Sequence, residues 1–164
     1  MQERGFSLIE VLIVVAIILI ISAIAIPSYL HSKIAANEAS AVYSIRTINT
    51  AQTTYATTYP TLGYANTLNQ LASAAWAAPA SSANAGVLDW VLGCTSEICP
   101  KSGYNFQLAN VPITPPAGEP ISAYSVWGTP ITIGTTGYGG FCSDNMNPIV
   151  VDPLGESACT MALQ

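Results

Sequence analysis

The sequence predicts an α+β protein in which one long N-terminal helix packs on a small antiparallel sheet of about four strands. Three observations predict this class. Residues 6–26 are almost entirely apolar and carry one charge, residues 28–59 contain neither glycine nor proline, and beyond Tyr104 apolar residues alternate within short segments. A chain of 164 residues is long enough for one globular domain besides such a hydrophobic helix.

The composition limits the partners of the chain. Its formal net charge is -5, and Lys and Arg together number 4. Binding of nucleic acid through phosphates needs clustered cations, so direct nucleic-acid binding is not expected. Charged residues make up 8% of the chain, whereas about 25% is typical. Such a surface suits a subunit that buries much of itself against copies of itself.

The N-terminal apolar block is long enough to cross a membrane. As a helix, residues 6–26 would extend roughly 30 Å, the thickness of a hydrocarbon core. The charge in this block, Glu10, would cost about 2.5–3.5 kcal/mol at a helix centre and less near an end, so it requires a cationic partner. Cleavage after Gly5 would supply one, because the new amine of Phe6 would lie at the membrane depth of Glu10 in a neighbouring copy.

The order of these residues resembles a known leader. Residues 4–11, with the sequence RGFSLIEV, and the apolar run that follows them to Pro27 are similar to the class III leader of type IV prepilins and pseudopilins. The resemblance implies that a prepilin peptidase and N-methyltransferase cuts after Gly5 and methylates Phe6, and that Glu10 is the assembly carboxylate. The leader itself, residues 1–5, departs from the family because its single basic residue stands beside an acidic one.

The resemblance also implies a fold and a cellular route. The fold would be that of type IV pilins, with residues 6–27 as the transmembrane and filament-core half of the helix, and the helix near residues 19–28 would melt on assembly. The precursor would cross the inner membrane once. The pilus assembly machinery would then place it in an extracellular homopolymer, a helical filament, and no cofactor is implied.

Two other interpretations of the N-terminal block remain open. Residues 23–25 (AIA) form a small-x-small site at which a secretory signal would be cut, and the block is otherwise compatible with a plain membrane anchor that never assembles. A signal core should be apolar where Glu10 stands, and a plain anchor leaves Glu10 without a purpose. The mature N-terminus distinguishes the three interpretations, since it would be Phe6, Ile26 or Met1.

Residues 28–59 are predicted to form the amphipathic half of the helix. One face carries residues spaced mostly by three and four, namely Ile34, Ala41, Ile45, Ile48, Gln52, Tyr55 and Tyr59. Pro27 removes a backbone donor, so it should kink the helix without ending it, and the helix should end near Pro60. The tyrosines of this region are expected to pack against the sheet rather than to carry electrons; they are Tyr29, Tyr43, Tyr55, Tyr59 and Tyr64.

The connecting region, residues 60–103, should hold a short helix within residues 66–76 and a small ring closed by a disulfide. An even number of cysteines in an exported domain indicates disulfides, and the four cysteines allow three connectivities. Proximity favours two pairs, Cys94 with Cys99 and Cys142 with Cys159. A four-cysteine zinc site would prefer two C-x-x-C pairs, which this spacing does not provide.

Residues 104–164 should form the sheet and a C-terminal loop bounded by a disulfide. The expected strands are short, rich in β-formers and bounded by turn residues, and they cover residues 104–108, 123–127, 138–142 and 149–151. Their apolar side, from Phe106, Tyr124 or Val126, and Phe141, should be covered by the second half of the helix. Closing the C-terminal loop would restrict the unfolded chain by about 3 kcal/mol.

One loop gathers oxygen-bearing side chains of the kind that bind calcium, namely Asp144, Asn145, Asn147, Asp152 and Glu156. The alternative is turn chemistry, in which Asp and Asn bond to their own backbone beside proline and glycine. The spacing matches no calcium motif, so these residues are candidates and no metal site is predicted.

The sequence contains no recognisable catalytic constellation. The single histidine, His31, has no nucleophile near it in the sequence to activate. The glycines within residues 137–140 lack the lysine and the following helix of a phosphate loop. The chain is therefore not expected to be an enzyme.

The sequence thus predicts a structural, major-type pilin of a type IV pilus, with adhesion, motility, DNA uptake or surface attachment as consequences of the filament. The alternatives are a pseudopilin of a type II secretion system and a minor, tip-located pilin. Two cysteine pairs without a clear calcium motif favour the pilus over the secretion system. The presence of Glu10 favours a major subunit.

Overall fold

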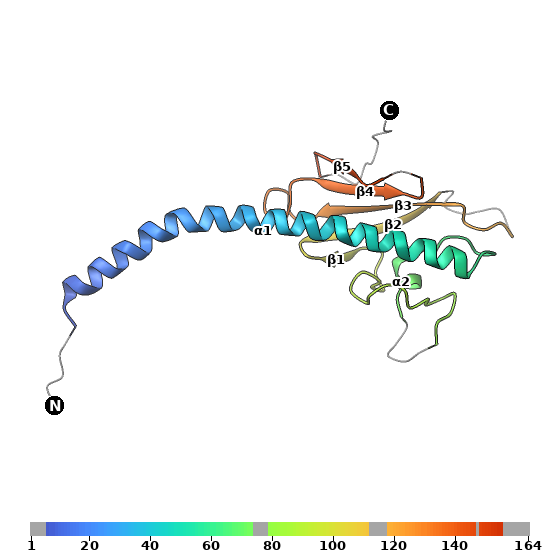
Figure 1. Ribbon diagram of the computed structural model, residues 1–164, viewed down its shortest axis with the longest axis horizontal. Coiled ribbons are helices and arrows are strands. Elements are labelled where there is room, and N and C mark those ends of the chain that lie inside the picture. The colour runs from blue at the N-terminus through green and yellow to red at the C-terminus, as the bar shows by residue number, and fades with distance from the viewer. Residues whose placement is uncertain (1–5, 74–78, 112–117, 147, 156–164) are drawn as a thin grey trace. The chain divides into compact units, whose positions relative to one another are not determined.

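A computed structural model of the chain describes residues 6–73, 79–111, 118–146 and 148–155 (Figure 1). The chain divides into two compact units, Met1–Lys33 and Ile34–Gln164. Helix α1, Leu8–Thr58, begins in the first unit, runs through Pro27 and ends in the second unit, close to the predicted end. The second unit also holds a short helix, α2, Leu68–Leu71, and a five-stranded sheet.

The five strands are antiparallel, and their order in the sheet, β1-β2-β3-β4-β5, is also their order in the chain. Their bounds are β1 Cys99–Lys101, β2 Tyr104–Val111, β3 Ala123–Pro130, β4 Gly140–Asp144 and β5 Val150–Asp152. Each strand pairs with the next, so the sheet is a meander with β1 and β5 at its edges. The predicted α+β class is confirmed, and the four expected strands correspond to β2, β3, β4 and β5.

The fifth strand, β1, lies in the region that was expected to be a connection. Its central residue is Pro100, which gives a poor strand signal but is tolerated because β1 is at the edge of the sheet. Ser102 and Gly103 form the two-residue turn into β2 with φ angles of 50° and 77°, as tight hairpins with positive φ at both central positions require. The pairing of Cys99 with Phe106 joins the cysteine ring to the sheet.

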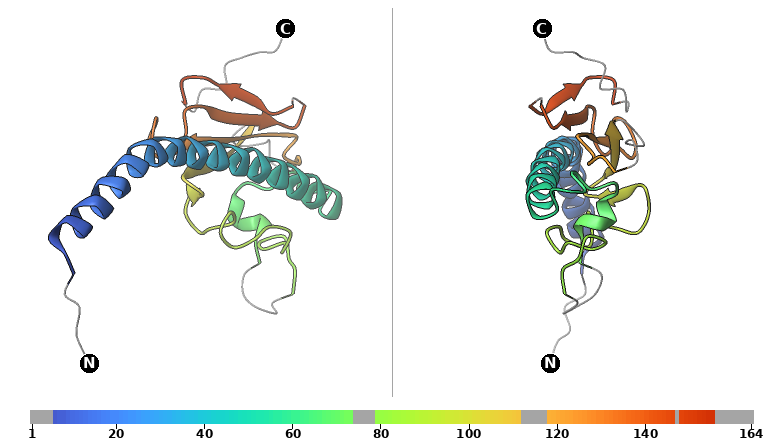
Figure 2. Two further views of the ribbon diagram at one scale, coloured as in Figure 1. Left: turned by 60° about the vertical axis from the view of Figure 1, so that its left-hand side comes forward. Right: turned by 90° about the vertical axis from the view of Figure 1, so that its right-hand side faces the viewer.

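The part of α1 within the second unit covers one face of the sheet (Figure 2). The buried residues of the helix include most of the predicted face and are Ile34, Ala41, Ser44, Ile45, Ile48, Ala51, Gln52 and Tyr55. The predicted inward residues of the sheet are also buried, and they are Phe106, Tyr124, Val126 and Phe141. The spacing of three and four along the helix and the alternation along the strands therefore identified the core correctly.

Gly128 on β3 allows the helix and the sheet to approach closely. Burial alternates along β3, and Gly128 is one of the inward positions. A Cβ atom at this position would lie 2.9 Å from Cε1 of Phe106 and 3.7 Å from Cδ1 of Ile45. The absence of a side chain thus leaves the space that the Phe106 ring fills beneath α1.

Polar contacts fix the second half of α1 to the connection between β3 and β4. The side-chain amide of Asn37 donates to the backbone oxygen of Thr136 at 2.9 Å, and the Oε1 atom of Glu38 accepts from the backbone nitrogen of Tyr138 at 2.9 Å. Both bonds link residues about a hundred positions apart in the sequence. They set the position of the helix along the sheet.

The prediction for the tyrosines is correct only in part. Tyr55 is buried and its ring centroid lies 4.9 Å from that of Tyr59, but Tyr29 and Tyr43 are 66% and 69% exposed. A helix turns about 100° per residue, so Tyr43 and Tyr55 point in directions about 120° apart. The tyrosines therefore form no single stripe, and the prediction that Tyr29 and Tyr43 pack against the sheet is wrong.

Candidate functional site

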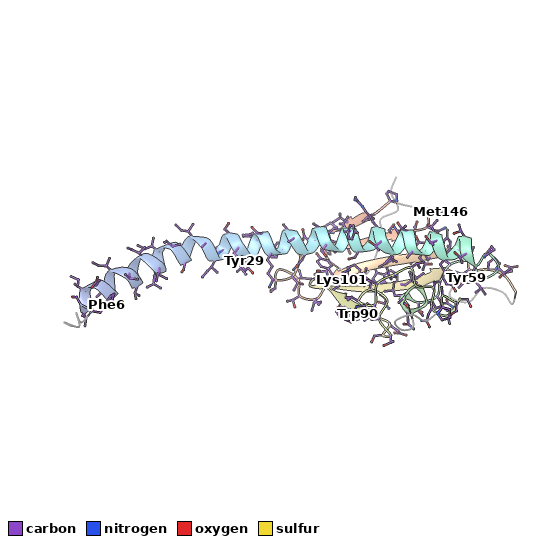
Figure 3. All side chains as sticks on the ribbon, turned by 60° about the horizontal axis from the view of Figure 1, so that its bottom comes forward. Phe6, Tyr29, Tyr59, Trp90, Lys101 and Met146 are labelled. Carbon is purple, nitrogen blue, oxygen red and sulfur yellow. A yellow bond between two sulfur atoms is a disulfide. The ribbon has the colours of Figure 1, made fainter. Side chains whose placement is uncertain are left out.

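The first unit presents its apolar side chains outwards. From Phe6 to Leu30 every large hydrophobic side chain is exposed, from 49% at Val11 and Val15 to 83% at Leu8 (Figure 3). Within the described residues, α1 is the one helix long and apolar enough to cross a membrane. Removing such a side chain from water contributes roughly 1.5–3 kcal/mol, so this surface favours cover by lipid or protein.

Glu10 lies in the first turn of α1, within this apolar surface. The helix begins where the backbone oxygen of Ser7 accepts from the nitrogens of Glu10 and Val11, at 3.1 Å and 3.3 Å. The helix macrodipole favours a carboxylate in this turn by about 0.3–1 kcal/mol, which is less than the cost of a charge inside a membrane. Across the described part of the chain the one salt bridge joins Lys101 to Asp89, so Glu10 has no cationic partner there.

The predicted processing residues stand at the same end of the helix as Glu10. Phe6 immediately precedes the helix and is 77% exposed. Gly5 lies outside the described residues, as does the rest of the predicted leader. The structure therefore places Phe6 and Glu10 about one helical turn apart, at one end of the apolar segment.

Pro27 stands inside α1, and the helix continues on both sides of it. Because proline has no N–H group, the backbone oxygen of Ala23 receives no hydrogen bond from position 27. A carbonyl group without its helical partner has no water to bond within a membrane, so this turn weakens the helix locally.

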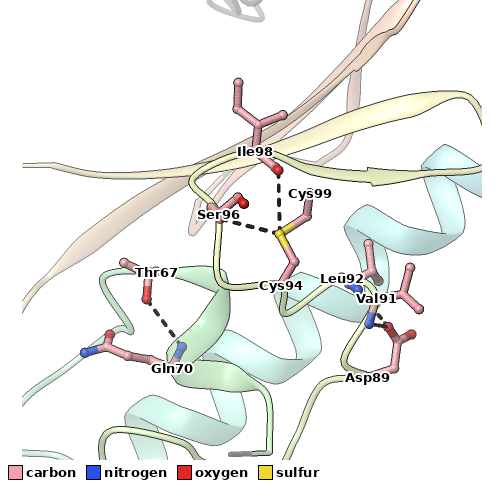
Figure 4. The surroundings of a disulfide bond; sticks show 9 residues. All are labelled: Thr67, Gln70, Asp89, Val91, Leu92, Cys94, Ser96, Ile98 and Cys99. Atoms are coloured by element: carbon pink, nitrogen blue, oxygen red, sulfur yellow. Dashed lines mark hydrogen bonds between the residues drawn. A yellow bond between two sulfur atoms is a disulfide. The ribbon is translucent and has the colours of Figure 1, made fainter.

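The disulfide between Cys94 and Cys99, predicted from their proximity, is present (Figure 4). The Sγ atom of Cys94 also lies 3.5 Å from the backbone oxygen of Ser96, inside the ring that the disulfide closes. Because Cys99 is the first residue of β1, the ring is attached directly to the edge of the sheet. Cys142 on β4 is disulfide-bonded as well, and its predicted partner, Cys159, lies outside the described residues.

The structure separates two of the candidate calcium ligands. Asp144 is the last residue of β4, whereas Asp152 on β5 pairs with Gly140, the first residue of β4. Asp144 thus lies at one end of β4 and Asp152 lies beside the other end, and four residues of a strand span roughly 13 Å. The Oδ1 atom of Asp144 accepts from the nitrogen of Met146 at 2.7 Å, and that of Asp152 from the nitrogen of Leu154 at 3.0 Å. In both cases an aspartate side chain stabilises a turn by bonding to the backbone two residues further on, as the alternative to a calcium site predicts.

Of the other calcium candidates, only Asn145 lies within the described residues. The amide of Asn145 donates to the backbone oxygen of Ser122 at 3.5 Å, while Asn147 and Glu156 lie outside those residues. Nowhere in the described part of the chain do three His, Cys, Asp or Glu side chains gather as a metal ion would require. His31 is exposed on α1 in the first unit.

One tightly built turn escaped prediction. At residues 89–92 the Oδ1 atom of Asp89 accepts from the nitrogens of Val91 and Leu92 at 3.0 Å and 2.8 Å, and its Oδ2 atom lies 3.1 Å from Nζ of Lys101. Burial raises the pKa of Asp89, but the Leu92 N–H and the Lys101 ammonium outweigh burial and hold the pKa below its usual value. An aspartate before a turn is a recognisable signal, whereas its partner Lys101 is twelve residues away.

Comparison with known proteins identifies the N-terminal segment. Residues 1–26 match a family model described as the prokaryotic N-terminal methylation motif, and the matched residues include Gly5, Phe6 and Glu10. No curated protein and no solved structure matches the chain. The motif supports a type IV pilin-like or pseudopilin protein, made as a membrane-anchored precursor and processed by a prepilin peptidase. The matched segment is a motif of structural, pilin-type proteins and not part of an enzyme family.

Proposed function

We propose that this chain is the major-type subunit of a type IV pilus, a structural protein that polymerises through its apolar N-terminal helix. One combination carries the proposal: the methylation motif coincides with an exposed apolar helix segment in which Glu10 is the single charge before Ile26. In the proposed route the leader, residues 1–5, is removed and Phe6 becomes the N-methylated first residue. The chain then leaves the inner membrane for an extracellular filament.

Because the apolar segment is exposed, it must be covered first by lipid and later by other copies of the helix. Lipid covers these side chains in the precursor, and neighbouring helices would cover them in the filament. Lipid tails are as apolar as leucine, so hydrophobic burial alone does not favour helix contacts over lipid contacts. A polar attraction between copies is therefore needed to select assembly, and Glu10 is the group in this segment that supplies one.

The proposed partner of Glu10 is the amine that cleavage creates on Phe6 of an adjacent copy. Four helical residues correspond to about 6 Å, so a shift of this size between parallel copies brings the two groups to one level. At about 4 Å, with an effective dielectric constant of about 20, two unit charges attract by roughly 4 kcal/mol. That attraction is comparable with the cost of about 2.5–3.5 kcal/mol for a charge inside the membrane.

The second unit would form the outside of the filament. In this assignment residues 28–59 connect the filament core to the sheet, residues 60–103 carry the cysteine ring, and residues 104–164 form the sheet and the C-terminal loop. The low proportion of charged residues, 8%, suits a unit that is partly covered by its neighbours. Adhesion, motility, DNA uptake or surface attachment would follow from the filament as a whole.

A pseudopilin of a type II secretion system carries the same kind of motif, and a minor tip pilin does too. Electron microscopy of sheared surface material, with antibodies against this chain, separates these roles. A major pilin labels along the length of long surface fibres and is the most abundant pilin in them. Absence of such fibres would assign the chain to a secretion system, and labelling of fibre tips alone would make it a minor subunit.

The role of Glu10 is tested by replacing it with alanine, using Glu119→Ala as a matched loss of one exposed acid in the second unit. We expect both variants to be inserted and processed, with Phe6 as the mature N-terminus by mass spectrometry. Filaments should be recovered from the Glu119→Ala strain and reduced at least tenfold in the Glu10→Ala strain. Normal filament yield from Glu10→Ala would contradict the pairing, and a mature chain that begins at Met1 or Ile26 would contradict the processing.

A further inference from the structure

An open groove in the second unit has no role in the proposed assembly. Two pockets, with volumes of about 340 Å³ and 570 Å³, lie beside the ring that Cys94 and Cys99 close. Both are lined by Asn69 and Thr95, so they are neighbours, and the two together are called the groove below. Figure 4 shows the disulfide between α2 on one side and the Asp89 turn on the other.

We propose that this groove binds a neutral oligosaccharide. Its two ends carry different chemistry: Glu97 and Gln107 line one end, and Asn84 and Trp90 line the other. Amide and carboxylate groups are planar and offer two bonding atoms to a pair of neighbouring sugar hydroxyls. An indole ring offers a flat apolar face to the C–H side of a pyranose. A saccharide needs both kinds of contact, because each of its rings has an apolar face and a rim of hydroxyls.

The charges on the groove exclude the commoner anionic ligands. Among the lining residues that the structure describes there is no Lys, Arg or His, and the nearby Lys101 is paired with Asp89 at 3.1 Å. Phosphate groups and nucleic acids are bound through cations, so neither suits this surface. The lining is mixed, because eight of its sixteen residues bear amide or hydroxyl groups and the others include Trp90 and Val91; a ligand with both polar and apolar faces suits it better than a purely apolar one.

Trp90 is held in an exposed position by the structure around it. The side chain is 79% exposed and projects from the second unit (Figure 3), yet Leu88 and Leu92 on either side of it are 6% and 0% exposed. The carboxylate of Asp89 fixes the turn between those anchors. An aromatic side chain has only two rotatable bonds, so it loses little conformational entropy when a ligand covers it.

Close packing also fixes the turn that carries Trp90 against the end of α2. A Cβ atom on Gly93 would collide with the Cβ atom of Ala72, the residue that follows α2. Glycine at this position therefore brings the turn against the end of α2. The amide of Asn84 donates to the backbone oxygen of Asn69 at 3.2 Å, which ties the loop before the turn to the same helix. The groove is thus preformed from three segments.

The environment of Trp90 can be followed by fluorine NMR of the full-length chain. The chain has 3 Trp residues, so labelling with 5-fluorotryptophan gives a simple spectrum, and Trp90→Phe assigns the resonance of interest. Dodecylphosphocholine micelles are suitable because this detergent, unlike maltosides, has no sugar headgroup. The probes are maltohexaose, cellohexaose, chitohexaose and a galactose-containing hexasaccharide, each titrated to about 10 mM, which exceeds a dissociation constant of about 1 mM tenfold.

We expect a saturable shift of the Trp90 resonance with at least one probe. Asn69→Ala should weaken that binding at least fivefold, while Tyr43→Ala, which removes an exposed aromatic ring outside the groove, should leave it unchanged. No shift with any of the four sugars would overturn the proposal, as would equal binding by Asn69→Ala. A Trp90 shift that depends on protein concentration without sugar would also overturn it, because the groove would then be a contact between copies. The proposal does not depend on polymerisation.

Discussion

Replacing Gln52 with alanine should destabilise the second unit strongly, because two backbone groups depend on this side chain. Gln52 is 0% exposed; its Nε2 atom donates to the backbone oxygen of Ala65 at 3.1 Å and its Oε1 atom accepts from the backbone nitrogen of Ala65 at 2.8 Å. Ala65 is 1% exposed, so water does not replace the lost bonds. A buried polar group without a partner costs about 1–3 kcal/mol, and we therefore expect a loss of roughly 2–5 kcal/mol in the free energy of unfolding.

Thermal unfolding of the full-length chain in micelles, followed by near-ultraviolet circular dichroism, measures this effect. The expected loss corresponds to a fall in Tm of roughly 5–15 °C. Thr53→Ala is the matched control, because Thr53 is the next residue, is exposed and bonds only within the helix, to Asn49 at 3.0 Å. Gln52→Leu retains the volume of the side chain without its bonds and should lose nearly as much stability as Gln52→Ala. Equal Tm values for Gln52→Ala and Thr53→Ala would refute the reasoning.

Three further predictions concern the second unit. Burial raises the pKa of Tyr104 and of Tyr124 to about 12, while unfolded tyrosine titrates near 10. The unfolded chain therefore loses these protons first, so the contribution of the two tyrosines to stability should be complete below about pH 10 and should be lost between about pH 10 and 12. Ultraviolet titration of tyrosinate checks this, and ionisation of every tyrosine near pH 10 in the folded chain would contradict it. Replacing both Cys94 and Cys99 with serine should lower the free energy of unfolding by about 2 kcal/mol, because the disulfide closes a short loop and so restricts the unfolded chain. A change below about 0.5 kcal/mol in denaturant titrations would show that the disulfide does not stabilise the fold through this restriction. Gly128→Ala should lower the free energy of unfolding by about 1–3 kcal/mol, because the added methyl group would clash with Phe106. Thr129→Ala, at the next and outward-facing position, should change the free energy of unfolding by less than about 0.5 kcal/mol. Similar Tm values for the two variants would count against the close approach of α1 to the sheet at Gly128.

The main elements of the fold follow from periodic patterns that can be read from the sequence. Ile45 and Ile48 lie on a face spaced for a helix, and both are 0% exposed beneath the sheet. Phe106 and Val126 stand at alternating positions, and both point inwards. Burial of an apolar face determines these elements, and that driving force is visible in the order of residues alone.

Other parts of the fold depend on contacts between distant residues. The strand β1 has only three residues, Cys99–Lys101, with a proline at its centre, and it is held by pairing with β2 rather than by its own pattern. Tyr43 fits a tyrosine-rich segment but lies on the outer face of the helix, because the angle between residues decides burial more than residue type does.

Of the two candidate sites, the assembly residues could be predicted from the sequence and the groove could not. The assembly residues Phe6 and Glu10 stand in a short motif of fixed spacing, and the family match over residues 1–26 includes both. The groove beside the cysteine ring could not be predicted, because Asn69, Trp90 and Gln107 come from three separate segments that only the folded chain brings together. The pairing of Glu10 with an amine also stays a prediction, since it involves a second copy.

The most direct test of that pairing is a distance measurement in assembled filaments by solid-state NMR. One batch of chain carries ¹⁵N in phenylalanine and another carries ¹³C in the glutamate carboxyl group, and filaments are formed from a mixture of the two. We predict a dipolar contact between the Phe6 amine nitrogen of one copy and the Glu10 carboxyl carbon of another, at a separation of about 4 Å. Filaments that lack this contact, or in which the Phe6 nitrogen still resonates as a peptide amide, would contradict the account.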